Sequence, residues 1–267
     1  GAGLAAAFGA PLAGVLFALE ELHKNFSAEV LVSTMAASAV ADYIAVNIIG
    51  LRPVFDFDVE HRIPLRIYWA VVLLGVILGI LGVLYNKLLD KMQDFFDRFD
   101  SKFVSIGIML MISFLMMFIY PTVLGSGNDL VKVISDGKFT LIALAILLVA
   151  KLFFSTGSFG TGTPGGIFLP LLVIGAITGG LYSTFLSTAF GVEEYYIKGF
   201  VIIAMAGFFA AIVRAPITGV ILITEMTGNF MTLLSLVSAS LVAYVVADLL
   251  GGEPVYDQLM HRRQRKK

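Results

Sequence analysis

The chain has 267 residues, of which 58% are hydrophobic and 14% are charged. Soluble domains carry roughly 25% charged residues, so the composition excludes an ordinary water-soluble domain and indicates an integral membrane protein. The formal net charge is −1 and cysteine is absent, which argues against a nucleic-acid partner and excludes disulfides and thiolate metal sites. The three histidines (His23, His61 and His261) are too scattered to indicate a metal site. No metal and no cofactor are expected.

Long segments without Asp, Glu, Lys or Arg mark the expected membrane helices. They cover residues 1–19, 67–86, 103–128, 152–192 and 226–247. A helix rises about 1.5 Å per residue and needs roughly 20 apolar residues to cross the hydrocarbon core. Several segments are therefore long enough to span a membrane, and residues 152–192 can hold two helices. No segments of alternating polarity are visible, so the predicted fold class is an all-α integral membrane protein.

Polar joints separate these segments, near residues 23–29, 52–66, 87–102, 125–138 and 193–198. Lys151 is an isolated charge between long apolar runs, and we expect it to extend toward an interface, with a role in an ion pathway as the alternative. Gly75, Gly79 and Gly82 share one helical face, which predicts close helix packing. Residues 261–267 form a basic tail, which the positive-inside rule assigns to the cytoplasm.

Two features of the apolar segments point to transport and to an incomplete repeat. Glycine and proline interrupt residues 164–170, which read Pro-Gly-Gly-Ile-Phe-Leu-Pro. Broken helices of this kind survive in a membrane where protein or a cavity solvates the backbone, and they are typical of transporters. The first residues lack both Met and the basic segment of a signal peptide. Because the chain opens inside a Gly/Ala-rich pattern, we expect an amino-terminal truncation.

An internal repeat relates residues 5–20 to residues 210–225. Both segments contain Ala-Ala, then Ala-Pro, then Gly-Val, and both end in an acid, Glu20 or Glu225. Each predicts a small-residue helix, a new helix beginning at Pro11 or Pro216, and an acidic helix end. Chance matching of apolar runs is the alternative. We therefore expect duplicated halves of which the amino-terminal one is largely missing, with residues 1–60 ending the first repeat, residues 61–260 forming the second and residues 261–267 forming the cytoplasmic tail.

Four motifs in order resemble the CLC family of chloride channels and chloride/proton antiporters. They are residues 3–14 with Glu20 and Glu21, residues 165–170, residues 214–219 (Arg-Ala-Pro-Ile-Thr-Gly) and residues 251–256 (Gly-Gly-Glu-Pro-Val-Tyr). The resemblance implies an inverted-repeat architecture of short, tilted and broken helices. It also implies a homodimer with one anion pathway per subunit. The family's anion-coordinating Ser and its gating Glu would lie upstream of Gly1.

The resemblance also implies an anion site made of uncharged donors. A helix amino terminus carries about half a positive charge, and a phenol hydroxyl donates one hydrogen bond without net charge. By the resemblance, the amides of Ile167 and Phe168 are the anion ligands, and Gly166 and Tyr256 complete the predicted anion-binding set. A plain helix break and an interfacial tyrosine are the alternatives. Residues 125–127 (Gly-Ser-Gly) are expected to form a turn.

Adjacent acids end the first repeat segment. A helix end at the aqueous interface explains them in the simplest way, whereas the resemblance makes Glu21 the proton-transfer residue of an antiporter. Partial burial would raise its pKa and let it load protons near neutral pH. Glu20 and Glu225 are expected to be structural acids at helix ends.

We therefore expect a chloride/proton antiporter of the bacterial inner membrane, with chloride and protons as substrates. A passive chloride channel and a non-conducting scaffold of the same fold are the alternatives. An intramembrane enzyme is disfavoured because no His-Glu-x-x-His motif is present.

Overall fold

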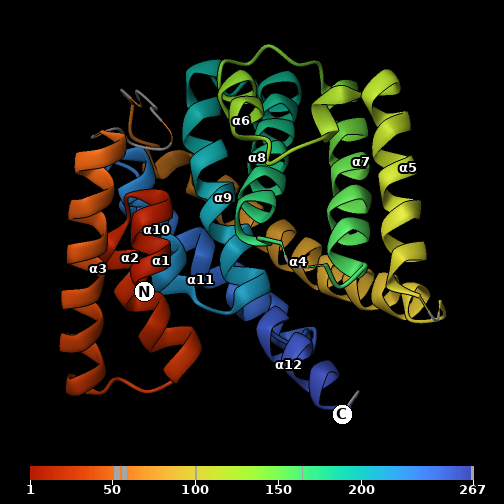
Figure 1. Ribbon diagram of the computed structural model, residues 1–267. Helices are drawn as coiled ribbons and strands as arrows, with labels where there is room; N and C mark the ends of the chain where they lie inside the picture. The colour runs from red at the N-terminus through yellow and green to blue at the C-terminus, as the bar shows by residue number, and fades with distance from the viewer. Residues whose placement is uncertain (51–54, 56–58, 60, 100, 164, 266–267) are drawn as a thin grey trace.

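The computed structural model describes residues 1–50, 55, 59, 61–99, 101–163 and 165–265, and every regular element in that part of the chain is helical (Figure 1). A π-helical turn, Ala18–His23, follows the second helix and ends at Lys24. The α-helices are α1 Ala2–Phe8, α2 Pro11–Phe17, α3 Ala28–Ile49, α4 Tyr68–Phe96, α5 Lys102–Ile119, α6 Asn128–Ser135, α7 Leu141–Gly160, α8 Phe168–Phe190, α9 Ile197–Val213, α10 Pro216–Thr227, α11 Leu233–Leu249 and α12 Val255–Arg265.

Six helical segments are long and apolar enough to cross a membrane, namely α3, α4, α5, α7, α8, and α9 together with the short helical turn Glu194–Tyr196 before it. The prediction of an all-α membrane protein is confirmed. Residues 152–192 hold α8 but only the end of α7, because α7 begins at Leu141 and continues through Lys151 to Gly160. The charge-free runs did not indicate α3, which contains Glu29 and Asp42, or α9, which contains Lys198. A single charge near a helix end or on a polar face is compatible with a span, so charge-free length is too strict a criterion.

The expectations about the first segment and about the joints have mixed outcomes. Residues 1–19 contain the two helices that the repeat predicts, because α1 ends at Gly9 in the left-handed region (φ 58°) and Pro11 begins α2. The joint near residues 87–102 begins only at Asp97, because α4 continues to Phe96. Part of the joint near residues 52–66, and Pro164 of the predicted break, lie outside the described residues.

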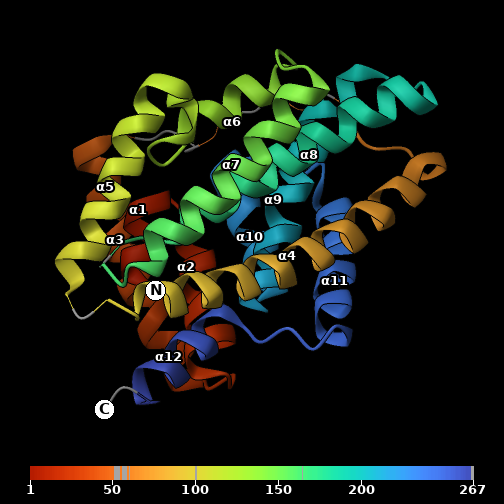
Figure 2. The same ribbon diagram turned by 90° about the vertical axis from the view of Figure 1, so that its right-hand side faces the viewer.

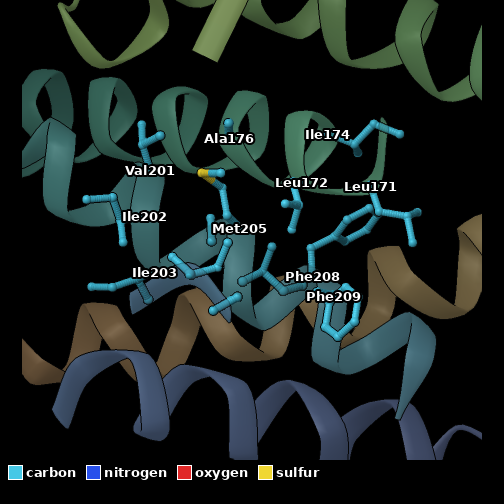
Figure 3. Packing of buried hydrophobic residues seen from close by; sticks show 14 of the residues in the cluster. Leu171, Leu172, Ile174, Ala176, Val201, Ile202, Ile203, Met205, Phe208 and Phe209 are labelled. Carbon is cyan, nitrogen blue, oxygen red and sulfur yellow. The ribbon is translucent and has the colours of Figure 1, made fainter. Parts of the chain in front are cut away.

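α9 lies at the centre of the molecule, and its neighbours are α8, α4, α11 and α10. Figure 3 shows side chains from α8 and α9, such as Leu172, Met205 and Phe208, packed in this core above α4 and α11. α4 approaches α11 through the predicted glycine face. A Cβ added at Gly79 would lie 2.7 Å from the Cβ of Val246, closer than real side chains allow. The glycine face is therefore confirmed as a packing surface, as expected where helices associate through small residues.

The acids at the ends of the repeat segments cap each other's helices. Glu225, near the end of α10, accepts hydrogen bonds from the Leu12 and Ala13 amides at 3.0 and 2.8 Å. Glu20 accepts from the Ile217 and Thr218 amides at 3.2 and 2.7 Å. Because each acid reaches the amino terminus of the opposite helix, α2 and α10 run antiparallel side by side. The expectation that Glu20 and Glu225 are structural acids is confirmed.

The basic tail is only partly separate from the membrane domain. His261 to Arg265 belong to α12, and Lys266 and Lys267 lie outside the described residues. Arg262 binds a stripe of acids on α4 at 2.6–2.8 Å, formed by Asp90, Asp94 and Asp97. The described part of the basic tail is thus a helix that docks on the end of α4, beside the amino-terminal helices in Figure 2. The acidic face of α4 attracts it there.

Candidate anion and proton site

The predicted anion loop leads directly into α8. Ile167 precedes the helix, Phe168 is its first residue, and Pro170 lies in the first turn, where a missing amide costs nothing. A Cβ added at Gly165 or Gly166 would meet no atom within 4 Å. No side chain in the described part of the chain accepts a hydrogen bond from the amides of Gly166, Ile167 and Phe168. The positive end of α8 is therefore left open for an anion.

A cavity of about 190 Å³ adjoins this loop. Its polar wall comes from α7 and from the segment that follows it, including Lys151 and the hydroxyls of Ser155, Ser158 and Thr163. Among the described residues that line the cavity none carries a carboxylate, and their polar groups are neutral dipoles and the one positive charge of Lys151. Such an electrostatic environment favours an anion over a cation.

Lys151 does not extend toward an interface, contrary to expectation. Its side chain is 1% exposed, and its Nζ donates to the carbonyl oxygens of Val123 and Gly125 at 2.8 and 2.9 Å. These carbonyls belong to the segment that includes the Gly-Ser-Gly turn, in which Gly125 and Gly127 are left-handed (φ 67° and 84°). The turn itself is confirmed. Lys151 holds this turn against α7 because backbone carbonyls solvate the buried ammonium.

Aromatic rings connect the anion loop to the predicted tyrosine. The ring of Phe17, at the end of α2, lies edge-on to Phe168 at 6.0 Å and to Tyr256 at 5.7 Å between centroids. Phe8 and Phe209 flank Phe168 at 5.3 and 4.7 Å. The fold therefore brings α8 and α12 together around Phe17. Sequence reasoning missed Phe8 and Phe17, and the only available signal was their place within the repeat motif.

Tyr256 is held in place through the backbone that precedes it. Arg214 donates to the Gly252 carbonyl at 2.8 Å, and Asn86 donates to the Glu253 carbonyl at 2.8 Å. The Tyr256 hydroxyl has no hydrogen-bond partner among the described residues, and burial raises its pKa to about 12, with a smaller contribution from the charge of Glu21. The phenol thus stays protonated at physiological pH and remains available as a donor.

Glu21 lies on the π-helical turn after α2, outside the six candidate spans. Its residue surface is 5% exposed, and its Oε1 has no hydrogen-bond partner among the described residues. Desolvation raises the pKa of this carboxyl to about 7, partly opposed by the charge of Lys24. A carboxyl with this pKa gains and loses a proton close to neutral pH, as general acid–base and relay groups must. The charge of Glu21 also acts on the Tyr256 phenol.

Comparison with known proteins gives a consistent result. Residues 1–248 match the family model described as voltage gated chloride channel. A relative from Vibrio cholerae, described as H(+)/Cl(-) exchange transporter ClcA, is 37% identical over 267 residues, which cover 97% of this chain and 57% of the relative. The chain therefore spans somewhat more than half the length of that curated relative.

Solved structures agree with this match. The crystal structure of a slow cyanobacterial Cl−/H+ antiporter superposes with a TM-score of 0.89 at 30% identity, over 99% of this chain and 63% of that one. A eukaryotic CLC transporter superposes with a TM-score of 0.76 at 22% identity, over 96% of this chain and 44% of that one. This second likeness bears on the fold alone.

Proposed function

We propose, from the premise that this chain belongs to the voltage-gated chloride channel family, that it is part of a chloride/proton antiporter. The observation that carries the proposal is the clustering of two kinds of group around Phe17. The ring of Phe168, the first residue of α8, and the ring of Tyr256 both contact the Phe17 ring, and the buried Glu21 acts on the same tyrosine. Groups suited to an anion and a group suited to a proton thus share one neighbourhood.

The anion is bound without a full positive charge at its ligands. The amides of Gly166, Ile167 and Phe168 supply the partial charge of the α8 amino terminus, and the Tyr256 hydroxyl donates from the other side. Binding by dipoles is strong enough to replace part of the hydration shell and weak enough to allow release. Phe168 and Phe17 provide an apolar wall that limits access of water.

The proton is carried by Glu21. Its carboxyl has a pKa of about 7 because burial disfavours the charged form, so both protonation states are populated at neutral pH. The repeat counterpart of Glu21 is Met226, which is fully buried and cannot titrate. Of these two equivalent positions, the one in the first repeat segment can therefore carry a proton and the one in the second cannot.

We place the protein in the bacterial inner membrane as a homodimer, with α12 on the cytoplasmic side. Arg262 and its neighbours in α12 make that end basic, as the positive-inside rule requires. The exposed apolar side of α3 and an apolar groove between α10 and α11, lined by Ile217, Val220 and Val237, offer surface for a second copy. Crosslinking through cysteines placed on this groove tests the dimer.

Flux measurements in liposomes test the proposed antiport. With the full-length protein that carries this chain, a chloride gradient is expected to drive protons uphill. Glu21→Gln should abolish proton movement and preserve chloride flux, whereas Glu29→Gln, an exposed acid on α3, should change neither. Chloride flux without protons in the unmodified protein would establish a channel. Absence of both would establish a scaffold.

Tyr256→Phe tests the anion site separately. The substitution keeps the ring contact with Phe17 and removes the hydroxyl donor. We expect chloride affinity, measured by isothermal titration calorimetry, to fall about tenfold, which corresponds to the loss of one hydrogen bond to a charged group. Unchanged affinity would remove Tyr256 from the site.

A further inference from the structure

An ion pair joins the segment that carries Glu21 to the helix that carries Tyr256. Lys24 Nζ lies 2.6 Å from both carboxylate oxygens of Asp257. Lys24 ends the π-helical turn in a left-handed conformation (φ 53°), three residues after Glu21, and Asp257 directly follows Tyr256 in the first turn of α12. The pair is therefore a direct polar link between the segment that carries the proposed proton group and the helix that carries the proposed anion group.

The ion pair between Lys24 and Asp257 contributes little to the stability of the fold. The Lys24 and Asp257 side chains are 50% and 25% exposed, and ion pairs in such positions contribute roughly 0–1 kcal/mol. The left-handed backbone of a residue with a side chain costs a comparable amount. The contact thus contributes little net stability to the fold, and its electrostatic effect on neighbouring groups becomes the more relevant property.

The two charges act on Glu21 in opposite directions. Lys24 lowers the pKa of the Glu21 carboxyl, and Asp257 and then Glu20 raise it to smaller degrees. α2 and α3 also pack against this turn. α2 carries no charged residue, and Glu29 and Asp42 of α3 are not among the groups that shift the pKa of Glu21. His23 has no part in this balance either. Desolvation is the main reason why the pKa of Glu21 is raised, and the two charges of the ion pair make smaller contributions of opposite sign.

We propose that Lys24 and Asp257 are positioning residues for proton transfer, which join the turn that carries Glu21 to the helix that carries Tyr256 and balance each other's charge beside the Glu21 carboxyl. The inference rests on the proposed function of Glu21. A pair of opposite charges near a titrating carboxyl has a small net field, so each partner screens the effect of the other. Breaking the pair from either side leaves one uncompensated charge beside Glu21.

Single and double substitutions distinguish an electrostatic role of the ion pair from the role of a clamp that only holds the two segments together. Lys24→Gln leaves Asp257 uncompensated and should raise the midpoint of Glu21 titration by about 0.5 pH unit or more. Asp257→Asn leaves Lys24 uncompensated and should lower the midpoint by a similar amount. The double variant should return close to the unmodified midpoint. A clamp without electrostatic action predicts shifts in one direction, or none, for both single variants.

The measurement is an infrared difference titration of the Glu21 carboxyl band in detergent, assigned by its loss in Glu21→Gln, together with the pH profile of proton flux in liposomes. Lys138→Gln breaks a matched surface pair with Asp136, 2.9 Å apart, and should move neither midpoint. Shifts of the same sign in Lys24→Gln and Asp257→Asn, or none in either, would overturn the inference. Opposite shifts in the infrared midpoint with proton flux insensitive to Glu21→Gln would support the electrostatic role and refute the proposed proton path instead.

Discussion

The turn between α1 and α2 and the turn between α9 and α10 have the same backbone geometry. Gly9 and Arg214 are both left-handed (φ 58° and 70°), and each is followed by an alanine of similar conformation (φ −129° and ψ 69° at Ala10, φ −117° and ψ 75° at Ala215) and then by the proline that begins the next helix. The two repeat segments therefore share one backbone conformation at this turn. The side chain at the left-handed position is what differs, since it is absent at Gly9 and is a long cation at Arg214.

From its left-handed position, the Arg214 side chain makes contacts that a glycine could not make. Its guanidinium donates to the Tyr244 and Gly252 carbonyls at 2.7 and 2.8 Å and lies 5.5 Å from the centroid of the Tyr244 ring. These contacts fix the turn that leads to Tyr256. The first repeat segment thus has glycine, which adopts a left-handed conformation without strain. The second has Arg214 at this position, and its side chain holds part of the proposed anion site.

The helices that follow these turns differ as well. α10 continues as a regular helix to Thr227, whereas α2 ends at Phe17 and passes into a π-helical turn. π-helical turns inside α-helices occur frequently at functional sites. At the equivalent position beyond the capping acid, the first segment has Glu21 and the second has Met226. A repeat that is symmetric in its turns and caps is therefore asymmetric in its ionisable groups.

Removing the reciprocal caps is expected to have the largest effect on stability. Glu20→Ala leaves two amides and the Thr218 hydroxyl without an acceptor, and should cost about 4 kcal/mol. Glu225→Ala leaves two amides without an acceptor and should cost about 3 kcal/mol. Unfolding in mixed detergent micelles measures both. Equal costs would show that the extra Thr218 contact contributes nothing and that the two caps are equivalent.

Replacing Glu21 by the residue of the other repeat should remove a pH dependence of stability. The folded protein holds the Glu21 proton with a pKa of about 7, above the ordinary value of 4.5. The folded state therefore binds more protons between these values, and stability falls as pH rises through them, by on the order of 3 kcal/mol. Glu21→Met should abolish this fall. Parallel pH curves for the two proteins in a thermal unfolding series would contradict a raised pKa.

Making the second turn resemble the first should destabilise the protein by about 2 kcal/mol. Arg214→Gly relieves the left-handed strain, a gain of about 1 kcal/mol, and loses two hydrogen bonds from a charged donor that are worth about 3 kcal/mol together. The change should also weaken chloride binding, because the Gly252 carbonyl then loses its donor. An increase in stability would show that strain outweighs these contacts.

The reverse change at the first turn should have the smallest effect. Gly9→Ala places a side chain at φ 58° with no atom within 4 Å of the added Cβ, so only backbone strain opposes it, at about 1 kcal/mol. Chloride affinity should remain unchanged. A larger loss of stability would mean that the first turn makes contacts that the second turn does not.

Sequence reasoning found the elements of the site more readily than their surroundings. The positions of the α8 amino terminus, the Pro-initiated helices and the acidic helix ends follow from local patterns of glycine, proline and charge. The burial of Lys151 did not, because an isolated lysine between apolar runs is equally compatible with an interface and with buried carbonyl oxygens. The aromatic contact of Phe17 was missed for a similar reason, since Phe168 and Tyr256 are distant in sequence.

The sequence by itself determined that the protein is helical and lies in a membrane, because composition and apolar length act locally along the chain. It also determined the family and the repeated turn, because ordered motifs and a constant offset are properties of the chain alone. Only the tertiary structure decided that Glu20 and Glu225 cap each other's helices and that Lys24 pairs with Asp257. These contacts join residues more than 190 positions apart. Which helix ends meet is set by packing of the whole core, and local spacing carries no information about it.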